Sequence, residues 1–190
     1  MTTASGGSSD AAKRVRTVVL PHAADLFAER GPAATTMRDI ADRSGVNAGL
    51  IFRHIGTKEA VVTSVLEYLA EDLVSARDGG TARTVVEARA ERSWKVIARA
   101  LLDGFDVARL QHRFPNIDQL LAAARDHYDD DYTARVATAD ALALQLGWRL
   151  FGPFLRAATG LDKLSVRDTP APATGFISLL LGDPRGLRGD

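Results

Sequence analysis

The sequence predicts an all-α protein, and three observations support that fold class. Apolar residues recur at spacings of three and four through most of the 190 residues, which is the period of an amphipathic helix. No segment shows a convincing alternation of apolar and polar residues, as a half-buried strand would. Residues 35–62 hold two helix caps and a glycine turn in one short run. We therefore expect about nine helices, as an N-terminal helix-turn-helix head of three helices and a C-terminal helical bundle.

The N-terminal segment predicts a disordered tail and then the first helix. Residues 1–9 are small and polar, so they cannot bury enough surface to hold a fixed shape. Helical spacing of apolar residues then continues as far as Gly31. Pro21 interrupts this helix, because proline lacks a backbone donor and crowds the preceding turn. Two arrangements stay open: a helix kinked at Leu20, which we favour, and a regular helix that begins near Pro21.

Two short helices follow, set around a glycine. Thr36 can cap the first with its hydroxyl, and Asp39 can complete a capping box from three residues further on. Gly45 supplies the left-handed backbone that ends this helix, and Asn47 offers an oxygen that starts the next. With Ile51 buried, the residues of the second helix that face away from the core are Asn47, Ala48, Leu50 and Arg53. This helix is too short to be stable without packing.

The remaining helices form the expected bundle. Thr57 can cap a long fourth helix that ends before Gly79, and a fifth spans about residues 84–102. Pro115 marks a break after a short irregular segment. The further helices that we expect cover about residues 117–124, Asp131 to Leu155 with a bend near Gly152 and Pro153, and Phe176 to Leu181 after a loop at 160–174.

Several residues of the glycine-turn segment stand at fixed spacing without gaps: Thr36, Asp39, Ile40, Ala41, Gly45, Val46, Gly49, Phe52, His54, Lys58 and Glu59. In these positions, and upstream through residues 23–31, the sequence resembles the TetR family of transcriptional regulators. The resemblance covers about a quarter of the chain. It implies a helix-turn-helix DNA-binding domain at residues 10–56 and a ligand-binding and dimerisation domain at 57–190, in a repressor that a small molecule releases from double-stranded DNA.

The resemblance also implies which residues contact DNA: Thr36, Arg38, Asn47, Ala48, Gly49, Leu50, Phe52, Arg53, His54 and Lys58. Thr36 and Lys58 stand at helix N-termini, where backbone amides add to a phosphate contact. Arg38 matches a position that can reach a base edge, and arginine with guanine is the commonest specific contact. A solvated surface arginine is the alternative interpretation of Arg38.

Three positions depart from the family pattern or narrow the base readout. Phe52 stands where the family usually has tyrosine, so a hydroxyl bond to phosphate is lost and affinity should fall. Ala48 and Leu50 can contact a thymine methyl but cannot read a hydrogen-bond pattern. We therefore expect readout by Arg38, Asn47, methyl contacts and DNA shape.

Composition and charge narrow the function further. The chain has no cysteine, which excludes a disulfide framework and a thiol redox sensor. It has no signal segment and no apolar run of about 20 residues, so we expect a cytoplasmic protein with no membrane partner. Residues 1–60 carry eight Lys and Arg against six Asp and Glu, and the remainder carries 16 against 18. This small asymmetry predicts a moderate dependence of DNA binding on salt.

The helical body shows no catalytic signature, so we expect neither an enzyme nor a cofactor. Acidic residues with a histidine cluster at 126–131, but a solvated acidic loop explains them better than a metal site, because adjacent aspartates cannot all point at one ion. Aromatic residues in the region where the family builds its ligand cavity are Trp94, Phe105, Phe114, Tyr128, Trp148 and Phe151. We expect a small, mostly apolar effector there, although helical aromatics are more often core residues.

The size of one head predicts a homodimer. Two heads on a two-fold axis can contact a palindrome with half-sites about 34 Å apart, or multiples of it, whereas one head offers too little contact for a specific site. We expect the helices near Asp131 to Leu155 and near Phe176 to Leu181 to form the interface. A regulator controlled by a protein partner, or a helical enzyme, remains as an alternative.

Overall fold

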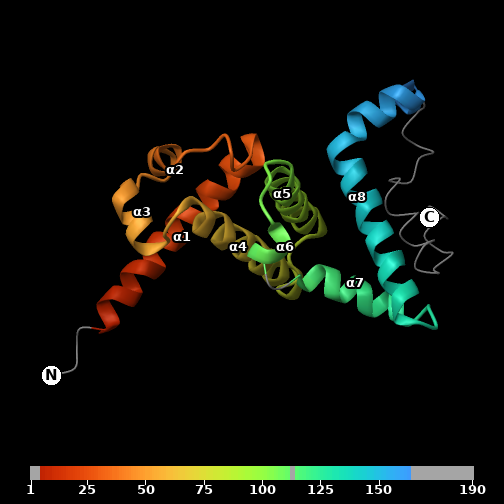
Figure 1. The fold of residues 1–190 in the computed structure, drawn as a ribbon, viewed down its shortest axis with the longest axis horizontal. Helices are drawn as coiled ribbons and strands as arrows, with labels where there is room; N and C mark the ends of the chain where they lie inside the picture. The colour runs from red at the N-terminus through yellow and green to blue at the C-terminus, as the bar shows by residue number, and fades with distance from the viewer. Residues whose placement is uncertain (1–4, 112–113, 164–190) are drawn as a thin grey trace. The chain divides into compact units, whose positions relative to one another are not determined.

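The computed structural model describes residues 5–111 and 114–163 (Figure 1). This part of the chain contains helices only, which confirms the all-α prediction. The helices are α1 (Ser5–Arg30), α2 (Met37–Ser44), α3 (Ala48–His54), α4 (Lys58–Asp78), α5 (Arg83–Leu102), α6 (Val107–Leu110), α7 (Pro115–Arg125), α8 (Asp131–Thr159) and the 3-10 helix η1 (Leu161–Lys163). The expected helix at Phe176 to Leu181 lies outside the described residues.

The helices fall into two compact units, which divide between residues 113 and 114. The first unit holds α1 to α6, and the second holds α7, α8 and η1. The sequence suggested a division at residue 56, after the three-helix head. In the structure α4, α5 and α6 pack in the same compact unit as the head, and the functional boundary after residue 56 stays a prediction.

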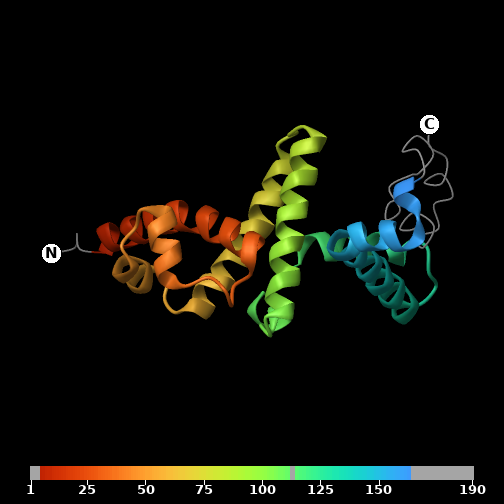
Figure 2. The same cartoon turned by 90° about the horizontal axis from the view of Figure 1, so that it is seen from above.

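One apolar core explains why the first unit holds together. Its buried members come from all six helices of the unit, α1 to α6. They are Val19, Leu20, Ala23, Ala24, Leu26, Phe27, Ile40, Ile51, Val61, Val62, Val65, Leu66, Leu69, Val96, Ala100 and Val107. In Figure 2, α5 lies across the C-terminal end of α1, where the two helices pack together. Because head and body helices share this core, a displacement of α4 or α5 changes the packing of the head directly.

Helix α1 is longer than the sequence predicted. It begins at Ser5, inside the expected tail of residues 1–9, and it continues through Pro21 to Arg30. A regular helix that begins only near Pro21 is therefore excluded. The carbonyl oxygen of Pro21 accepts a hydrogen bond of 2.9 Å from the guanidinium of Arg92 on α5, so α5 contacts the backbone of α1 at the proline.

The second unit begins at Phe114, one residue before Pro115, where the sequence predicts a break. Pro115 is the first residue of α7, a position that tolerates proline because its missing N–H has no partner within the helix. Helix α8 starts after Asp130, whose carboxylate accepts from the Thr133 N–H at 2.8 Å. It runs on through Pro153 to Thr159, four residues past the predicted end. Among the residues that the structure describes, none of the helices is long and apolar enough to cross a membrane.

Candidate nucleic-acid interface

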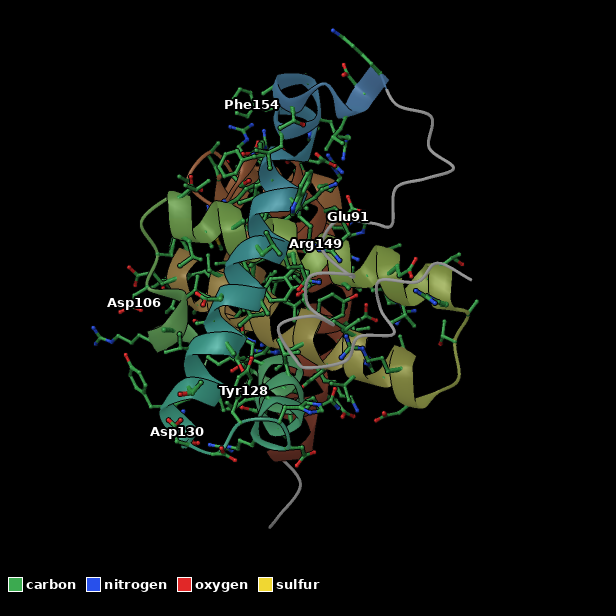
Figure 3. The ribbon with its side chains drawn as sticks, turned by 90° about the vertical axis from the view of Figure 1, so that its right-hand side faces the viewer. Glu91, Asp106, Tyr128, Asp130, Arg149 and Phe154 are labelled. Atoms are coloured by element: carbon green, nitrogen blue, oxygen red, sulfur yellow. The ribbon has the colours of Figure 1, made fainter. Side chains whose placement is uncertain are left out.

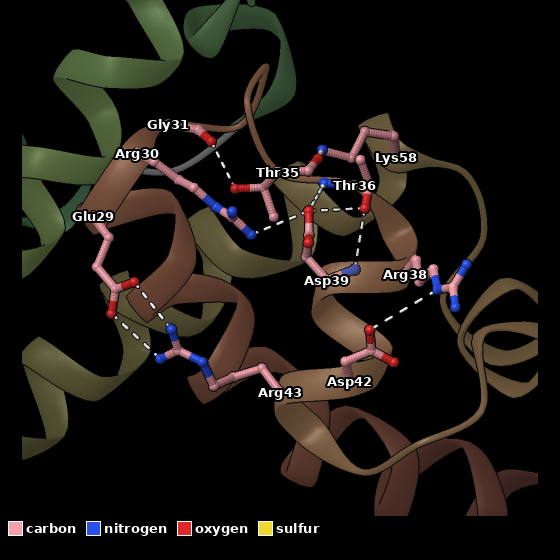
Figure 4. A network of polar contacts seen from close by, with 10 residues as sticks. All are labelled: Glu29, Arg30, Gly31, Thr35, Thr36, Arg38, Asp39, Asp42, Arg43 and Lys58. Atoms are coloured by element: carbon pink, nitrogen blue, oxygen red, sulfur yellow. Dashed lines mark hydrogen bonds and ion pairs between the residues drawn. The ribbon is translucent and has the colours of Figure 1, made fainter.

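Helix α2 begins with the capping box that the sequence predicted (Figure 4). The Thr36 hydroxyl accepts from the Asp39 N–H at 3.1 Å, and the Thr36 N–H donates to the Asp39 carboxylate at 2.7 Å. The Thr36 hydroxyl also donates to the same carboxylate, and Arg30 forms an ion pair with it at 3.0 Å. The two hydrogen bonds that Thr36 donates to the carboxylate, from its N–H and its hydroxyl, hold the pKa of Asp39 below its usual value, and the charge of Arg30 adds to this effect.

The turn between α2 and α3 is as short as the sequence predicted. Gly45 has a left-handed backbone (φ 68°) and ends α2. Asn47 caps α3, since its side-chain oxygen accepts from the Gly49 N–H at 2.8 Å. Ile51 is fully buried, and Ile55 packs partly against the same core. The core therefore holds α3 in place even though the helix has only seven residues.

The outer face of α3 is exposed and largely apolar. Leu50 is 44% exposed and Phe52 64% exposed. The other exposed residues of this face are Asn47, Ala48, Gly49 and Arg53, and His54 is half-buried. Six of the ten predicted contact residues are thus exposed on α3 or at its N-cap, and this helix is short enough to enter the major groove of DNA.

Arg38 is the second residue of α2, and its side chain is 91% exposed. Its guanidinium pairs with the carboxylate of Asp42, one turn further along the helix, at 4.0 Å. The pair borders a surface hollow that Gly45, Val46, Asn47 and Ala48 also line. Sequence reasoning missed Asp42, although the spacing of four residues from Arg38 is the signal for such a pair.

Lys58, for which we expect a phosphate contact, has partners within the protein in this structure. Its ammonium donates a hydrogen bond to the Thr35 carbonyl oxygen and lies 5.5 Å from the centre of the Phe27 ring. Burial lowers the pKa of Lys58, and the negative charges of Asp39 and Asp103 oppose that change only in part. In this structure the ammonium of Lys58 therefore joins α4 to the segment before α2.

The six predicted effector residues belong to different units. Trp94 and Phe105 lie in the first unit, and Phe114, Tyr128, Trp148 and Phe151 lie in the second. Phe105 packs against the core of the first unit, which accounts for its partial burial without a ligand. Phe151 is 55% exposed. Each of the other four is half-buried.

The acidic segment at 126–131 is used for helix capping and ion pairs. Tyr128 and Asp130 lie in the turn between α7 and α8 (Figure 3). The carboxylate of Asp131 pairs with Arg125 at 2.7 Å and with Arg135 at 2.6 Å. These guanidinium groups lower the pKa of Asp131, and hydrogen bonds from Thr133 lower that of Asp130. Both carboxylates thus have protein partners.

A short exposed helix, held against two others by a tight turn, defines a helix-turn-helix DNA-binding protein. The family model described as "Bacterial regulatory proteins, tetR family" matches residues 19–65. The HTH-type transcriptional repressor Rv3405c of Mycobacterium tuberculosis is 53% identical over 153 residues, which cover 80% of this chain and 81% of that protein. The chain belongs to the TetR family, and it is a transcriptional regulator, not an enzyme.

Two more relatives show how far the similarity extends. The HTH-type transcriptional regulator Mb3439c of Mycobacterium bovis is also 53% identical, with the same coverage of both chains. The HTH-type transcriptional repressor KstR2 of Rhodococcus jostii is 39% identical over 87 residues, which are 43% of each chain. The longer matches exceed the whole first unit, so they include part of the helical body as well as the DNA-binding head.

Proposed function

We propose that this regulator is a repressor that binds a palindromic operator as a homodimer and leaves it when a small, mostly apolar effector binds. The exposed face of α3 is the observation that carries the proposal. Leu50 and Phe52 are exposed there and are not part of the core of the first unit. Two relatives are named as transcriptional repressors, which supports repression as the direction of control. Because the chromosome is the target, we place the protein in the cytoplasm.

Direct readout is the part of this proposal that depends on Arg38. Replacing Arg38 with alanine should weaken binding to the operator about tenfold or more and relax the preference at one base pair, because one arginine contact with guanine discriminates by about 1–3 kcal/mol. Binding should be measured on the operator and its full set of single-base variants at one salt concentration. Unchanged affinity across that set would contradict direct readout.

An exposed pair on the other side of α2 provides the control for Arg38. Arg43 forms two hydrogen bonds with the Glu29 carboxylate on α1, at 3.1 and 3.3 Å (Figure 4). Arg43→Ala removes the same charge from the same short helix, where the guanidinium already has a partner within the protein. We expect Arg43→Ala to leave the preference for each base pair unchanged.

Dimerisation follows from the size of the head and is supported by α8. This helix exposes Tyr132, Val136, Phe151 and Phe154. Exposed large apolar residues on one helix are typical of an interaction surface. We propose α8 as part of the dimer interface, together with the segment Phe176 to Leu181 outside the described residues.

For release from DNA, we propose that the effector binds in the helical body and shifts the start of α4 near Thr57. That shift would change the spacing of the two heads on the operator. The effector must bind the two spacings with different affinity, because a ligand with equal affinity for both states shifts nothing. Phe114, Tyr128 and Trp148, which all lie in the second unit, are the half-buried aromatic residues that we propose for this site. Control by a protein partner is the alternative.

Selection of bound duplexes from a random pool, with the full-length chain, tests the central proposal. We expect enrichment of a palindrome with two half-sites, each contacted by one α3. The same preparation should then be screened with small apolar compounds by thermal shift, and each hit tested for loss of operator binding. A chain that prefers no duplex even at low salt would refute operator binding, and a protein-only release factor would refute the small effector.

A further inference from the structure

A carboxylate at the end of α5 contacts the backbone segment that leads into α2. Asp103 follows the last residue of α5, and its Oδ2 atom accepts a hydrogen bond from the Ala33 N–H at 2.7 Å. The two residues are 70 positions apart in the sequence. Short N–H to carboxylate bonds of this kind are among the stronger hydrogen bonds in proteins, because the acceptor carries a full charge.

The Asp103 carboxylate also lies close to Gly31, two residues before Ala33. Gly31 has a φ of +86°, which favours glycine. A Cβ atom built on Gly31 would lie only 2.7 Å from Oδ2 of Asp103. The backbone at residues 31–35, which we call the 31–35 turn, is therefore shaped to receive the Asp103 side chain.

Two further contacts fix the 31–35 turn. The Thr35 hydroxyl, which is buried, donates to the Gly31 carbonyl oxygen at 2.8 Å and closes the turn on itself. The ammonium of Lys58 at the start of α4 donates to the Thr35 carbonyl oxygen (Figure 4). The turn is thus bound by α5 through Asp103 and by α4 through Lys58. Thr36, the capping residue of α2, comes directly after it.

Helix α5 has its own contacts with the helices around it. Arg92 pairs with Asp25 of α1 at 3.1 Å, and Arg89 pairs with Asp72 of α4 at 2.7 Å. These pairs are partly shielded from solvent and lie far along α5 from Asp103. A shift of α5 would therefore act on the 31–35 turn through Asp103 and on α1 through Arg92.

We propose that Asp103 is a positioning residue for DNA binding, which fixes the 31–35 turn and with it the start of α2 relative to α5. This connection reaches α2 without passing through α4, the helix that our proposed release mechanism uses. Asp103 touches no DNA itself. Its effect comes from holding Arg38 and the short α2–α3 pair in the geometry that fits the groove.

The test compares specific and non-specific binding in four variants of the full-length chain. The duplex selected by the unmodified chain and a scrambled duplex of equal length are titrated at one salt concentration. Asp103→Ala removes the acceptor, Asp103→Ser shortens it out of reach, and Asp103→Asn keeps an oxygen in place. Asp106→Ala is the matched control, because the Asp106 carboxylate accepts a local hydrogen bond of 3.1 Å, from the backbone N–H of Arg109, and caps α6. Figure 3 labels Asp106.

The proposal predicts a loss of specific binding alone. Asp103→Ala and Asp103→Ser should weaken binding to the selected duplex about tenfold, as expected from the loss of one hydrogen bond to a charged group. Binding to the scrambled duplex should change less than about twofold, since non-specific affinity depends on charge rather than on position. Asp106→Ala should bind as the unmodified chain does, and Asp103→Asn should lose less than Asp103→Ala, because its neutral oxygen still accepts a weaker hydrogen bond. Hydrogen exchange at the Ala33 amide should become faster in the alanine and serine variants only.

Three outcomes would overturn the proposal. Equal losses on both duplexes would mean that the variants only lower the folded fraction. If Asp103→Ala binds the selected duplex as tightly as the unmodified chain, Asp103 has no positioning role. If the alanine variant does not fold, the same result with Asp103→Ser leads to the same conclusion. A similar loss in Asp106→Ala would assign the effect to the segment between α5 and α6 in general. Failure of the unmodified chain to select any duplex would instead refute the operator, and with it the specific contact that Asp103 is proposed to position.

Discussion

At the scale of single residues, several polar groups near the DNA-binding face already have partners within the protein. The Asn47 side chain bonds the Gly49 N–H, and the Thr36 hydroxyl donates to Asp39. Lys58 donates to the Thr35 carbonyl. What α3 presents outward is mostly apolar, so contacts with thymine methyl groups and DNA shape should carry more of the specificity than hydrogen bonds from this helix.

Phe52 offers the simplest gain-of-affinity test. It is 64% exposed on α3, and Phe52→Tyr adds only a hydroxyl at the tip of the ring. We expect the tyrosine variant to bind the operator several-fold to about tenfold more tightly, because the hydroxyl can donate to a phosphate oxygen. The dependence of affinity on salt should stay the same, since the hydroxyl adds no charge and releases no counterion. Fluorescence anisotropy at several salt concentrations measures both, and a weaker complex would contradict the expectation.

Lys58 provides the opposite test, because its charge is directed into the protein. If Lys58 keeps its contact with Thr35 on DNA, Lys58→Met should lower the melting temperature while leaving the salt dependence unchanged. If Lys58 turns to a phosphate, the slope of log affinity against log salt should become less negative by about 0.9. The structure favours the first outcome, since a phosphate contact requires the loss of the bond to the Thr35 carbonyl. Arg53→Met, on the exposed face of α3, is the control that should reduce the slope.

At the scale of elements, the sequence predicted best where caps mark helix ends. Thr36, Gly45, Asn47 and Thr57 each stand at the helix boundary that their chemistry indicates. Such signals are local, because the capping side chain and the amide that it bonds are two or three residues apart. Hence α2, α3 and α4 could be bounded closely from sequence alone.

Features that depend on distant residues could not be predicted in this way. The start of α1 at Ser5 has no local signal, since its glycines and serines favour no helix. Helix α1 passes through Pro21 while Arg92 of α5 bonds the Pro21 carbonyl, a contact over 71 positions. The contact of Asp103 with Ala33 spans 70 positions. Likewise, the division at residues 113 and 114 depends on packing between helices that the linear pattern does not contain.

The capping box of α2 makes the head sensitive to acid. Hydrogen bonds from Thr36 hold the folded-state pKa of Asp39 below its usual value. A lowered carboxyl pKa stabilises the fold fully above the unfolded-state pKa, and this contribution is lost as pH falls through the folded-state value. The melting temperature of the unmodified chain should therefore exceed that of Asp39→Asn near neutral pH, and the difference should shrink below about pH 4.

Circular dichroism melts between neutral pH and about pH 3 measure this difference. Asp130 and Asp131 also have lowered pKa values and lose their contributions in the same range, but they do so equally in both proteins. Asp42→Asn changes the same residue type in the same helix without touching the cap, and it is the control. A difference between the unmodified chain and Asp39→Asn that stays constant down to pH 3 would assign the cap's stability to geometry rather than to the carboxylate charge.

At the scale of the whole molecule, specificity should come from pairing two heads. One α3 has seven residues, and its exposed face offers few groups that can discriminate bases. A C2 dimer doubles these contacts and adds a fixed distance between them, which a random sequence rarely matches. The distance between the heads is then the quantity that an effector must change.

The spacing of the operator half-sites tests this arrangement in solution. In the selected palindrome, inserting five base pairs between the half-sites turns one of them by about half a helical turn, away from the second head. We expect at least about a hundredfold weaker binding, towards the non-specific level, because only one head can then make its base contacts. Inserting five base pairs outside the half-sites is the control and should change nothing. Sedimentation of the same protein at micromolar concentration should give twice the mass of one chain, and a monomer that tolerates the central insertion would overturn the two-headed model.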